Sequence, residues 1–385
     1  MTELQKLPNR GGKSTSPKKR DSNIDLLRAL CAVFVVFEHF CETDAHNAFG
    51  FSETASMPAH ILLRLMYGIA RVAVPVFFLL SGYLSINSTK QRIGKVINLF
   101  FMTAAYSCIS YVMVCVYGVI KGENNFSILH FMKTCIPMNY YLYLFCGVYM
   151  LSPFLNIIVK SLKRENYFRF IAVAFFLFSG WSTLINTGAS IASLEEIFGV
   201  FFTSRTGTSM GFNIANFTTM YLIGGYIRLY HKTNIKKDRK VSLLVILSST
   251  VITSTFKIIS PTISKAFLYY DSIFVTSSAI AMVILFLTIE IKPNKVITFL
   301  AMHTYGTFLI HGLASTCIEK IFSIEKIVSK GFMGTIIGIF IFVIGVYILA
   351  LIMTVSLETI AQPIKRKWKE TKLYNYTIYN GSETE

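Results

Sequence analysis

Charged side chains are scarce in this chain: Asp, Glu, Lys and Arg make up only 15% of its 385 residues. An ordinary soluble domain has about 25%. Hydrophobic residues account for 53%, and no polar block long enough for a soluble domain interrupts the apolar runs between Leu26 and Leu357. The composition therefore predicts one integral membrane domain, with lipid as its solvent.

The sequence also lacks the short motifs of several common enzyme classes. No P-loop, G-x-G-x-x-G, H-E-x-x-H or G-x-S-x-G string is present. The seven cysteines are odd in number and have no C-x-x-C spacing, so we expect neither a disulfide framework nor a metal site from them. No internal repeat of fixed period is visible, which weakens the inverted-repeat transporter architectures.

Acidic residues are few, 20 against 37 Lys and Arg, which leaves a net charge of +17. In a soluble protein such a charge would raise the question of nucleic acid. Here most basic residues gather on alternate connections between the apolar runs, as the positive-inside rule requires. We therefore interpret the charge as a signal of topology and expect no nucleic-acid partner.

The apolar runs predict an all-α polytopic transmembrane bundle of about ten helices, with both termini in the cytoplasm. Residues 1–20 are expected to be a disordered basic cytoplasmic tail, 21–360 a single transmembrane domain and 361–385 a polar basic cytoplasmic tail. Within the outer segment 187–215, the apolar group from Ile197 to Phe202 suggests a short re-entrant or interfacial helix. The predicted spans are 26–43, 65–86, 96–119, 140–159, 169–186, 216–230, 241–257, 271–288, 296–318 and 332–356.

Two ionisable residues share one face of the first predicted helix. Arg28 and His39 differ by about 20° around its axis and about 16 Å along it. A guanidinium near the inner mouth can pair with a phosphate, and a deeper imidazole can accept a proton from a hydroxyl. The simpler alternatives are an Arg28 that snorkels and pairs with Asp25, and a His39 that is hydrogen-bonded only for structure. Glu38 is expected either to pair within the bundle or to face an aqueous entrance.

Other candidate residues lie on the second and ninth predicted helices. Arg71 would hold an anionic acceptor or a developing oxyanion. Ser81, close to Tyr83, is either an acyl-carrying nucleophile or, more simply, a small residue that permits helix packing. His303 near the inner face and His311 about 12 Å deeper are expected to border one cavity. Their alternatives are an interfacial and a structurally bonded histidine.

Five segments, in order over about residues 20–315, resemble the signature of one membrane family. DLLRALCAVFVVFEHF is similar to its opening helix, in which an Arg is followed after ten residues by a His, and RVAVPVFFLLSGYLS to its Phe-Phe-x-x-Ser-Gly-Tyr/Phe segment. QRIGK resembles its Arg-x-x-Arg element, with Arg92 in place and Lys95 where a second Arg is usual. NYYLYLFCGVYMLSPFLN and MHTYGTFLIHG resemble helices that end in Leu-x-Pro and in Tyr/Phe-Leu-x-His. The family is the acyltransferase-3 family of integral membrane O-acyltransferases.

This resemblance implies transfer of an acyl group, usually acetyl from cytoplasmic acetyl-CoA, to a hydroxyl of a glycan or similar cell-surface acceptor. Carried over by position, Arg28 and His39 would be the essential pair, and Arg92 and Lys95 would lie near the donor phosphates. Lys95 keeps the charge of the usual Arg but loses its planar fork. We expect a multi-pass protein of a bacterial cytoplasmic membrane, without a metal cofactor and without the extracytoplasmic hydrolase-like domain of some members.

The sequence leaves several alternatives open. The chemistry would be either direct transfer, with His39 as general base, or a relay through an acylated His39. A transporter or exporter that uses the same Arg and His residues is the first rival function, and a sensor or assembly scaffold is the second. Acyl length, the identity of the acceptor and association into a homo-oligomer do not follow from the sequence.

Overall fold

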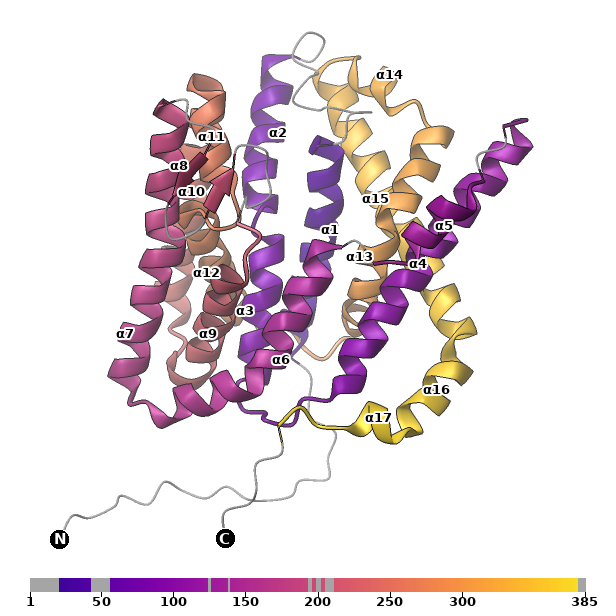
Figure 1. Cartoon of the computed structure of the whole chain (residues 1–385). Helices are drawn as coiled ribbons and strands as arrows, with labels where there is room; N and C mark the ends of the chain where they lie inside the picture. The colour runs from indigo at the N-terminus through magenta and orange to yellow at the C-terminus, as the bar shows by residue number, and fades with distance from the viewer. Residues whose placement is uncertain are drawn as a thin grey trace, which may run out of the picture.

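The computed structural model describes residues 21–42, 56–123, 126–137, 139–192, 196–198, 202–204 and 211–379. The predicted tail 1–20 and the last residues of the predicted tail 361–385 lie outside these ranges. Within them the chain is a bundle of long helices that run between two ends (Figure 1). The all-α transmembrane class predicted from the apolar runs is confirmed.

Each predicted span coincides with a helix or with consecutive helices of the described chain. Eight of these segments are long and apolar enough to cross a membrane, and α1 and α9 occupy the other two predicted positions. Seven predicted spans correspond to single helices: α1 (Ser22–Glu42), α4 (Ile93–Ile120), α6 (Tyr140–Ser161), α9 (Ile214–Tyr230), α10 (Ile235–Ile259), α13 (Lys295–Ile321) and α15 (Phe332–Ile360). Three correspond to consecutive helices: α2 (Met57–Ala70) and α3 (Ala73–Ser85); α7 (Arg164–Phe175), the π-helix η2 (Phe176–Gly180) and α8 (Trp181–Ala192); and α11 (Pro261–Leu268) and α12 (Ile273–Leu287). Two short helices, α5 (Ile128–Thr134) and α14 (Ile324–Val328), lie in connections.

Asparagine side chains begin four of the long helices. Asn139, Asn213, Asn234 and Asn294 each accept a hydrogen bond from a backbone N–H of the first turn of α6, α9, α10 and α13. An unpaired N–H costs several kcal/mol in a bilayer, so such caps let a helix start without leaving donors unsatisfied. The local sequence thus explains where these helices begin.

The second predicted span is interrupted between α2 and α3, at Arg71 and Val72. Pro75 lies four residues after Arg71 and has no N–H to offer the Arg71 carbonyl, which explains the break in the helical ladder. The break directs the Arg71 side chain toward α1 and the turn between α11 and α12, where its partners lie.

Helices α3 and α9 cross at two glycines. A Cβ atom added at Gly82 would lie 1.8 Å from the Tyr221 carbonyl oxygen, and one at Gly224 would lie 1.9 Å from the Leu79 carbonyl oxygen. Only glycine permits backbones to approach this closely, as in other membrane helix pairs. This contact fixes α3 beside α9 and determines which of its residues border the interior.

The segment expected to contain a short re-entrant or interfacial helix contains two short paired strands. Strand β1 (Glu196–Phe198) pairs antiparallel with β2 (Phe202–Ser204), with Ile197 opposite Thr203. The helix prediction is therefore wrong at Ile197, Phe198 and Phe202, and residues 199–201 lie outside the described residues. Aromatic and β-branched residues favour extended backbone, and pairing lets the two strands satisfy each other's hydrogen-bonding groups.

The C-terminal residues fold back onto the bundle. After α15, helices α16 (Gln362–Glu370) and α17 (Lys372–Asn375) lie at the end where α4 begins (Figure 1). The following segment pairs with the connection before α4: the Ile93 N–H donates to the Tyr376 carbonyl at 2.9 Å, and the Ile378 N–H to the Gln91 carbonyl at 2.8 Å. We call this end of the bundle the basic end, because Lys90, Arg92, Lys95 and the cations of α16 belong to it. The start of α1 lies near the start of α13, since the Asn294 N–H donates to Ser22 Oγ at 3.2 Å.

Candidate active site

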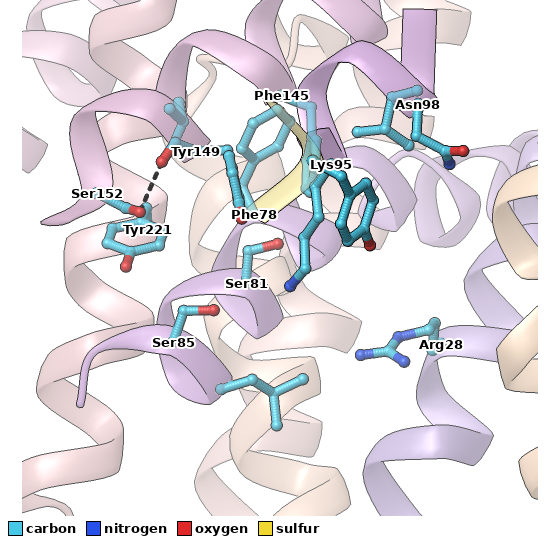
Figure 2. Close-up of a pocket in the computed structure, with 14 residues that line it drawn as sticks. Arg28, Phe78, Ser81, Ser85, Lys95, Asn98, Phe145, Tyr149, Ser152 and Tyr221 are labelled. Carbon is cyan, nitrogen blue, oxygen red and sulfur yellow. Dashed lines mark hydrogen bonds between the residues drawn. The ribbon is translucent and has the colours of Figure 1, made fainter. Parts of the chain in front are cut away.

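A cavity of about 340 Å³ lies at the basic end, among α1, α3, α4, α6 and α17. We call it the basic-end cavity. Figure 2 shows Arg28 and Lys95 reaching toward the same space from different helices, with Ser81 and Ser85 of α3 beside that space. Tyr374 of α17 also lines it. Two of the three cations that the sequence assigned to the donor phosphates, Arg28 and Lys95, therefore meet in one cavity.

The Arg28 side chain both pairs with Asp25 and borders a cavity, so it combines the two alternatives that the sequence left open. Its Nη1 lies 3.8 Å from Asp25 Oδ1, three residues earlier on α1, and the side chain is 24% exposed. It also borders the basic-end cavity and a neighbouring one. Pairing with Asp25 orients the guanidinium without removing it from the cavity wall.

The neighbouring cavity, of about 270 Å³, continues deeper into the bundle and is rich in aromatic residues. We call it the aromatic cavity. Arg28 and Ser81 line both cavities, so the two adjoin. Tyr141 of α6 and Tyr305 and Phe308 of α13 line only the deeper one. A ligand with a charged head and a narrow, less polar arm would match a cationic cavity that continues into an aromatic one.

The His39 ring packs against that of His311, which in turn contacts Phe308 of the aromatic cavity lining. Their ring centroids are 4.7 Å apart with planes tilted by 32°, and the His311 ring lies 5.8 Å from that of Phe308. Neither histidine lines the basic-end or the aromatic cavity. The structure thus places Arg28 in the cavity and the exposed His39 outside it, with His311 between His39 and Phe308 of the cavity lining.

The hydrogen bonding of His311 identifies its tautomer. Its Nδ1 is bonded to the Phe308 carbonyl oxygen. A carbonyl only accepts, so Nδ1 carries the hydrogen and, in the neutral ring, Nε2 is left as an acceptor. The bond also fixes the plane of the ring that packs against His39.

Arg71 lies in a buried network and not in either cavity. Its Nη1 is 3.0 Å from Glu38 Oε2 and 3.1 Å from the Tyr270 hydroxyl, while its Nε donates to the Leu268 carbonyl at 3.0 Å. The Tyr270 hydroxyl donates to the same Glu38 oxygen at 2.8 Å. Glu38 therefore pairs within the bundle, and the Arg71 charge that was expected to meet an acceptor or oxyanion is neutralised by it.

Arg92 and Lys95 occupy different surroundings although they are three residues apart. Lys95 lines the basic-end cavity, with its Nζ 5.8 Å from the centre of the Tyr149 ring. Arg92 precedes α4 on the exposed side and pairs through its backbone with Thr377 and with the Tyr149 hydroxyl. Of the two, only Lys95 borders the cavity.

The other predicted residues are distributed over three places. Ser81 Oγ donates to the Phe77 carbonyl at 2.8 Å, yet the residue lines both cavities. Tyr83 accepts from Arg228 Nη1 at 2.9 Å and lines neither. His303 lies in a separate groove between α13, α15 and α16, with Nδ1 3.0 Å from Glu358 Oε2. The structure thus separates His303 from His311, which had been expected to share a cavity.

Tyr374 is a lining residue that sequence analysis missed. It comes from the predicted polar tail, and its contact with the start of α4 joins segments far apart in the chain: a Cβ added at Gly94 would lie 2.3 Å from the Tyr374 Cα. No local pattern announces such a contact. A hint was the run of apolar and aromatic residues from Leu373 to Tyr379, which follows the basic stretch from Lys365 to Lys372. Within the described part of the chain, no group of three His, Cys, Asp or Glu side chains is arranged to hold a metal ion.

Comparison with known proteins gives one match. The model of the acyltransferase-3 family, described as an acyltransferase domain, matches residues 21–355, which is most of the chain. No curated protein and no solved structure matches it. The matched region contains every predicted site residue and both cavities, except for Tyr374.

Proposed function

The chain belongs to the acyltransferase-3 family, and on that premise we propose that it is an O-acetyltransferase that uses cytoplasmic acetyl-CoA and acetylates a glycan or a related cell-surface acceptor. The family match and the eight apolar helices make it a multi-pass membrane acyltransferase. The acetyl group, the CoA donor, the glycan acceptor and a bacterial cytoplasmic membrane are parts of the proposal.

The observation that carries the proposal is the meeting of Arg28 and Lys95 in a cavity that continues into an aromatic one. Cationic side chains at the mouth suit the phosphates of a coenzyme A donor. The deeper walls of Tyr141, Tyr305 and Phe308 suit its narrow pantetheine arm and thioester. Cavities of this size hold an arm or a drug-sized group, which leaves the nucleotide at the mouth.

The orientation follows from the basic end. Lys90, Arg92 and Lys95, together with the cations of α16, lie at this end of the bundle, and the positive-inside rule assigns it to the cytoplasm. The donor then enters from the compartment that holds acetyl-CoA. His39, near the other end of α1, lies on the side from which a cell-surface acceptor arrives.

In the proposed reaction, His39 takes the proton of an acceptor hydroxyl while the oxygen attacks the thioester carbonyl. The tetrahedral intermediate collapses with loss of the C–S bond, and the CoA thiolate leaves and is protonated. His311, whose ring is fixed by its bond to the Phe308 carbonyl, packs against the His39 ring and holds it in place. An acetyl relay through His39 would use the same atoms in two steps.

Replacement of His39 by Ala tests this proposal. We expect acetyl transfer in proteoliposomes supplied with acetyl-CoA to fall by a factor of about 10² to 10⁴, the usual contribution of a general base. His231→Gln is the matched control, because His231 pairs with Asp238 in the connection between α9 and α10, away from both cavities. Undiminished turnover in His39→Ala would refute the proposed role.

A carrier or exporter is the second candidate, because two adjoining cavities along the bundle would also serve a transported substrate. The two functions differ in their need for a donor. Flux of a sugar across the proteoliposome membrane without acetyl-CoA would favour the carrier, whereas a product that gains an acetyl increment only with donor present favours the enzyme.

A further inference from the structure

A third cavity, of about 360 Å³, lies between α4, α5 and α13, and no role has been assigned to it. We call it the polar cavity. No acidic residue is among the described residues that line it. Its polar lining consists of Thr103, Ser107, His130, Lys133, Thr134 and Asn139.

The polar cavity adjoins the proposed active site through one hydrogen bond. Thr103 Oγ1, which lines the polar cavity, lies 3.1 Å from the hydroxyl of Tyr305, which lines the aromatic cavity. On α13, Phe308 faces the aromatic cavity and Leu309 the polar one. The stretch of α13 from Tyr305 to His311 therefore touches the aromatic cavity, the polar cavity and His39.

The polar cavity lies farther from the basic end than the donor cavities. Lys95 lines the basic-end cavity, whereas Thr103 and Ser107, eight and 12 positions later on α4, line the polar cavity. At 1.5 Å per residue these positions lie about 12 and 18 Å farther along the helix. The polar cavity is thus placed to receive a molecule from the side of the membrane opposite to the donor.

The short helix α5 presents its polar residues to this cavity. His130, Lys133 and Thr134 are spaced by three and four residues and so share one face of the helix. Ile128 and Met132 are 64% and 62% exposed, as expected for side chains that meet lipid tails. No residue of α5 is buried, and His130 and Lys133 line the cavity while remaining exposed, so the cavity is open on the α5 side.

The His130 ring is held in place before any ligand binds. It stacks on Tyr111 with a centroid distance of 5.1 Å and an interplanar angle of 10°. The Tyr111 hydroxyl in turn accepts from the Ser127 N–H at 2.9 Å and donates to the Ser127 carbonyl at 3.1 Å. Tyr111 of α4 thus fixes both the start of α5 and the imidazole.

From this lining we infer that the polar cavity is the acceptor site and that its ligand is a sugar that carries a carboxylate. Hydroxyls, an amide and an imidazole offer the hydrogen bonds that a polyhydroxyl ring needs. One lysine without an acidic neighbour in the lining matches a single negative charge, which favours a carboxylate over a doubly charged phosphate. This inference rests on the proposed function, since an acceptor is required only if the protein transfers an acyl group.

Binding of D-glucuronate and of uncharged D-glucose to the full chain in lipid nanodiscs tests the inference, with saturation-transfer NMR as the readout. We expect the wild type to bind glucuronate about tenfold more tightly than glucose, which corresponds to one charge-assisted hydrogen bond. Lys133→Gln should abolish that preference and leave glucose binding unchanged. Lys133→Arg should keep it, because the charge is retained.

Lys121→Gln is the control, since Lys121 ends the same helix α4 outside the cavity and should not alter the preference. Equal affinity of the wild type for the two sugars, or an unchanged preference in Lys133→Gln, would overturn the inference. Glucose binding shows that each variant is folded. Acetyl-CoA binding, measured in the same nanodiscs, separates this test from that of the proposed function: its absence in the wild type would count against the enzyme, whereas Lys133→Gln should bind acetyl-CoA normally.

Discussion

Removal of the buried Arg71 charge should strongly destabilise the protein. The Arg71 and Glu38 side chains are only 7% and 5% exposed, and their Nη1–Oε2 distance is 3.0 Å. Arg71→Met leaves the Glu38 carboxylate buried without its cation, and breaking such a pair from one side costs about 3–5 kcal/mol. Because Arg71 also donates to Leu268 and contacts Tyr270, we expect the upper half of that range.

The double variant Glu38→Leu with Arg71→Met should recover about half of this loss. Replacing both members of a buried pair by apolar residues is often neutral or even stabilising. What remains is the Tyr270 hydroxyl, which loses its acceptor on Glu38 at a cost of about 1–3 kcal/mol. The double variant should therefore be about 2 kcal/mol more stable than Arg71→Met alone.

Reversible unfolding in lipid bicelles would measure the three free energies of unfolding, and acetyl transfer would be assayed on the same samples. A loss below about 1 kcal/mol in Arg71→Met, or a double variant no more stable than the single one, would refute the reasoning. The activities separate two roles of Arg71. If the arginine only holds α1 in place, turnover returns with the fold, whereas a direct role at an oxyanion would leave the double variant folded and inactive.

Two further predictions concern helix contacts. Gly82→Ala should destabilise the protein by at least about 1–3 kcal/mol, because its Cβ would meet the Tyr221 carbonyl oxygen, whereas Gly188→Ala, with no atom within 4 Å, should change stability by less than about 1 kcal/mol in the same bicelle assay. Mild oxidation should join Cys108 to Cys135, whose Sγ atoms lie 3.4 Å apart, and mass spectrometry of the digested protein would detect the linked peptides; their absence would show that α5 does not pack on α4 as described.

The transmembrane helices were predictable because the signal is local. A bilayer forces a spanning segment to be apolar and to satisfy its own backbone, so hydropathy alone locates α4, α10 and α15. The Pro75 interruption was likewise predictable from one residue. The strand pair Glu196–Phe198 and Phe202–Ser204 was not, because each strand has three residues and carries no period long enough to distinguish extended from helical backbone.

The residues of the candidate site were likewise predictable from the sequence only in part. Helical geometry placed Arg28 and His39 on one side of α1, and the family resemblance selected them together with Lys95. Contacts between distant segments could not be predicted: Tyr270 donates to Glu38, although the two residues are 232 positions apart in the sequence. The cavities themselves arise only where α1, α3, α4, α6 and α13 meet.

The sequence by itself determined the class of the protein, its spans and the few ionisable residues that must avoid lipid, because the cost of a charge in hydrocarbon acts on each residue separately. Tertiary structure alone decided the partners: Arg71 with Glu38, His39 with His311 and Tyr374 at the donor cavity. The reason is that helices in a bilayer associate by close packing and interhelical hydrogen bonds, and a small or polar residue on one helix does not specify which other helix it will contact.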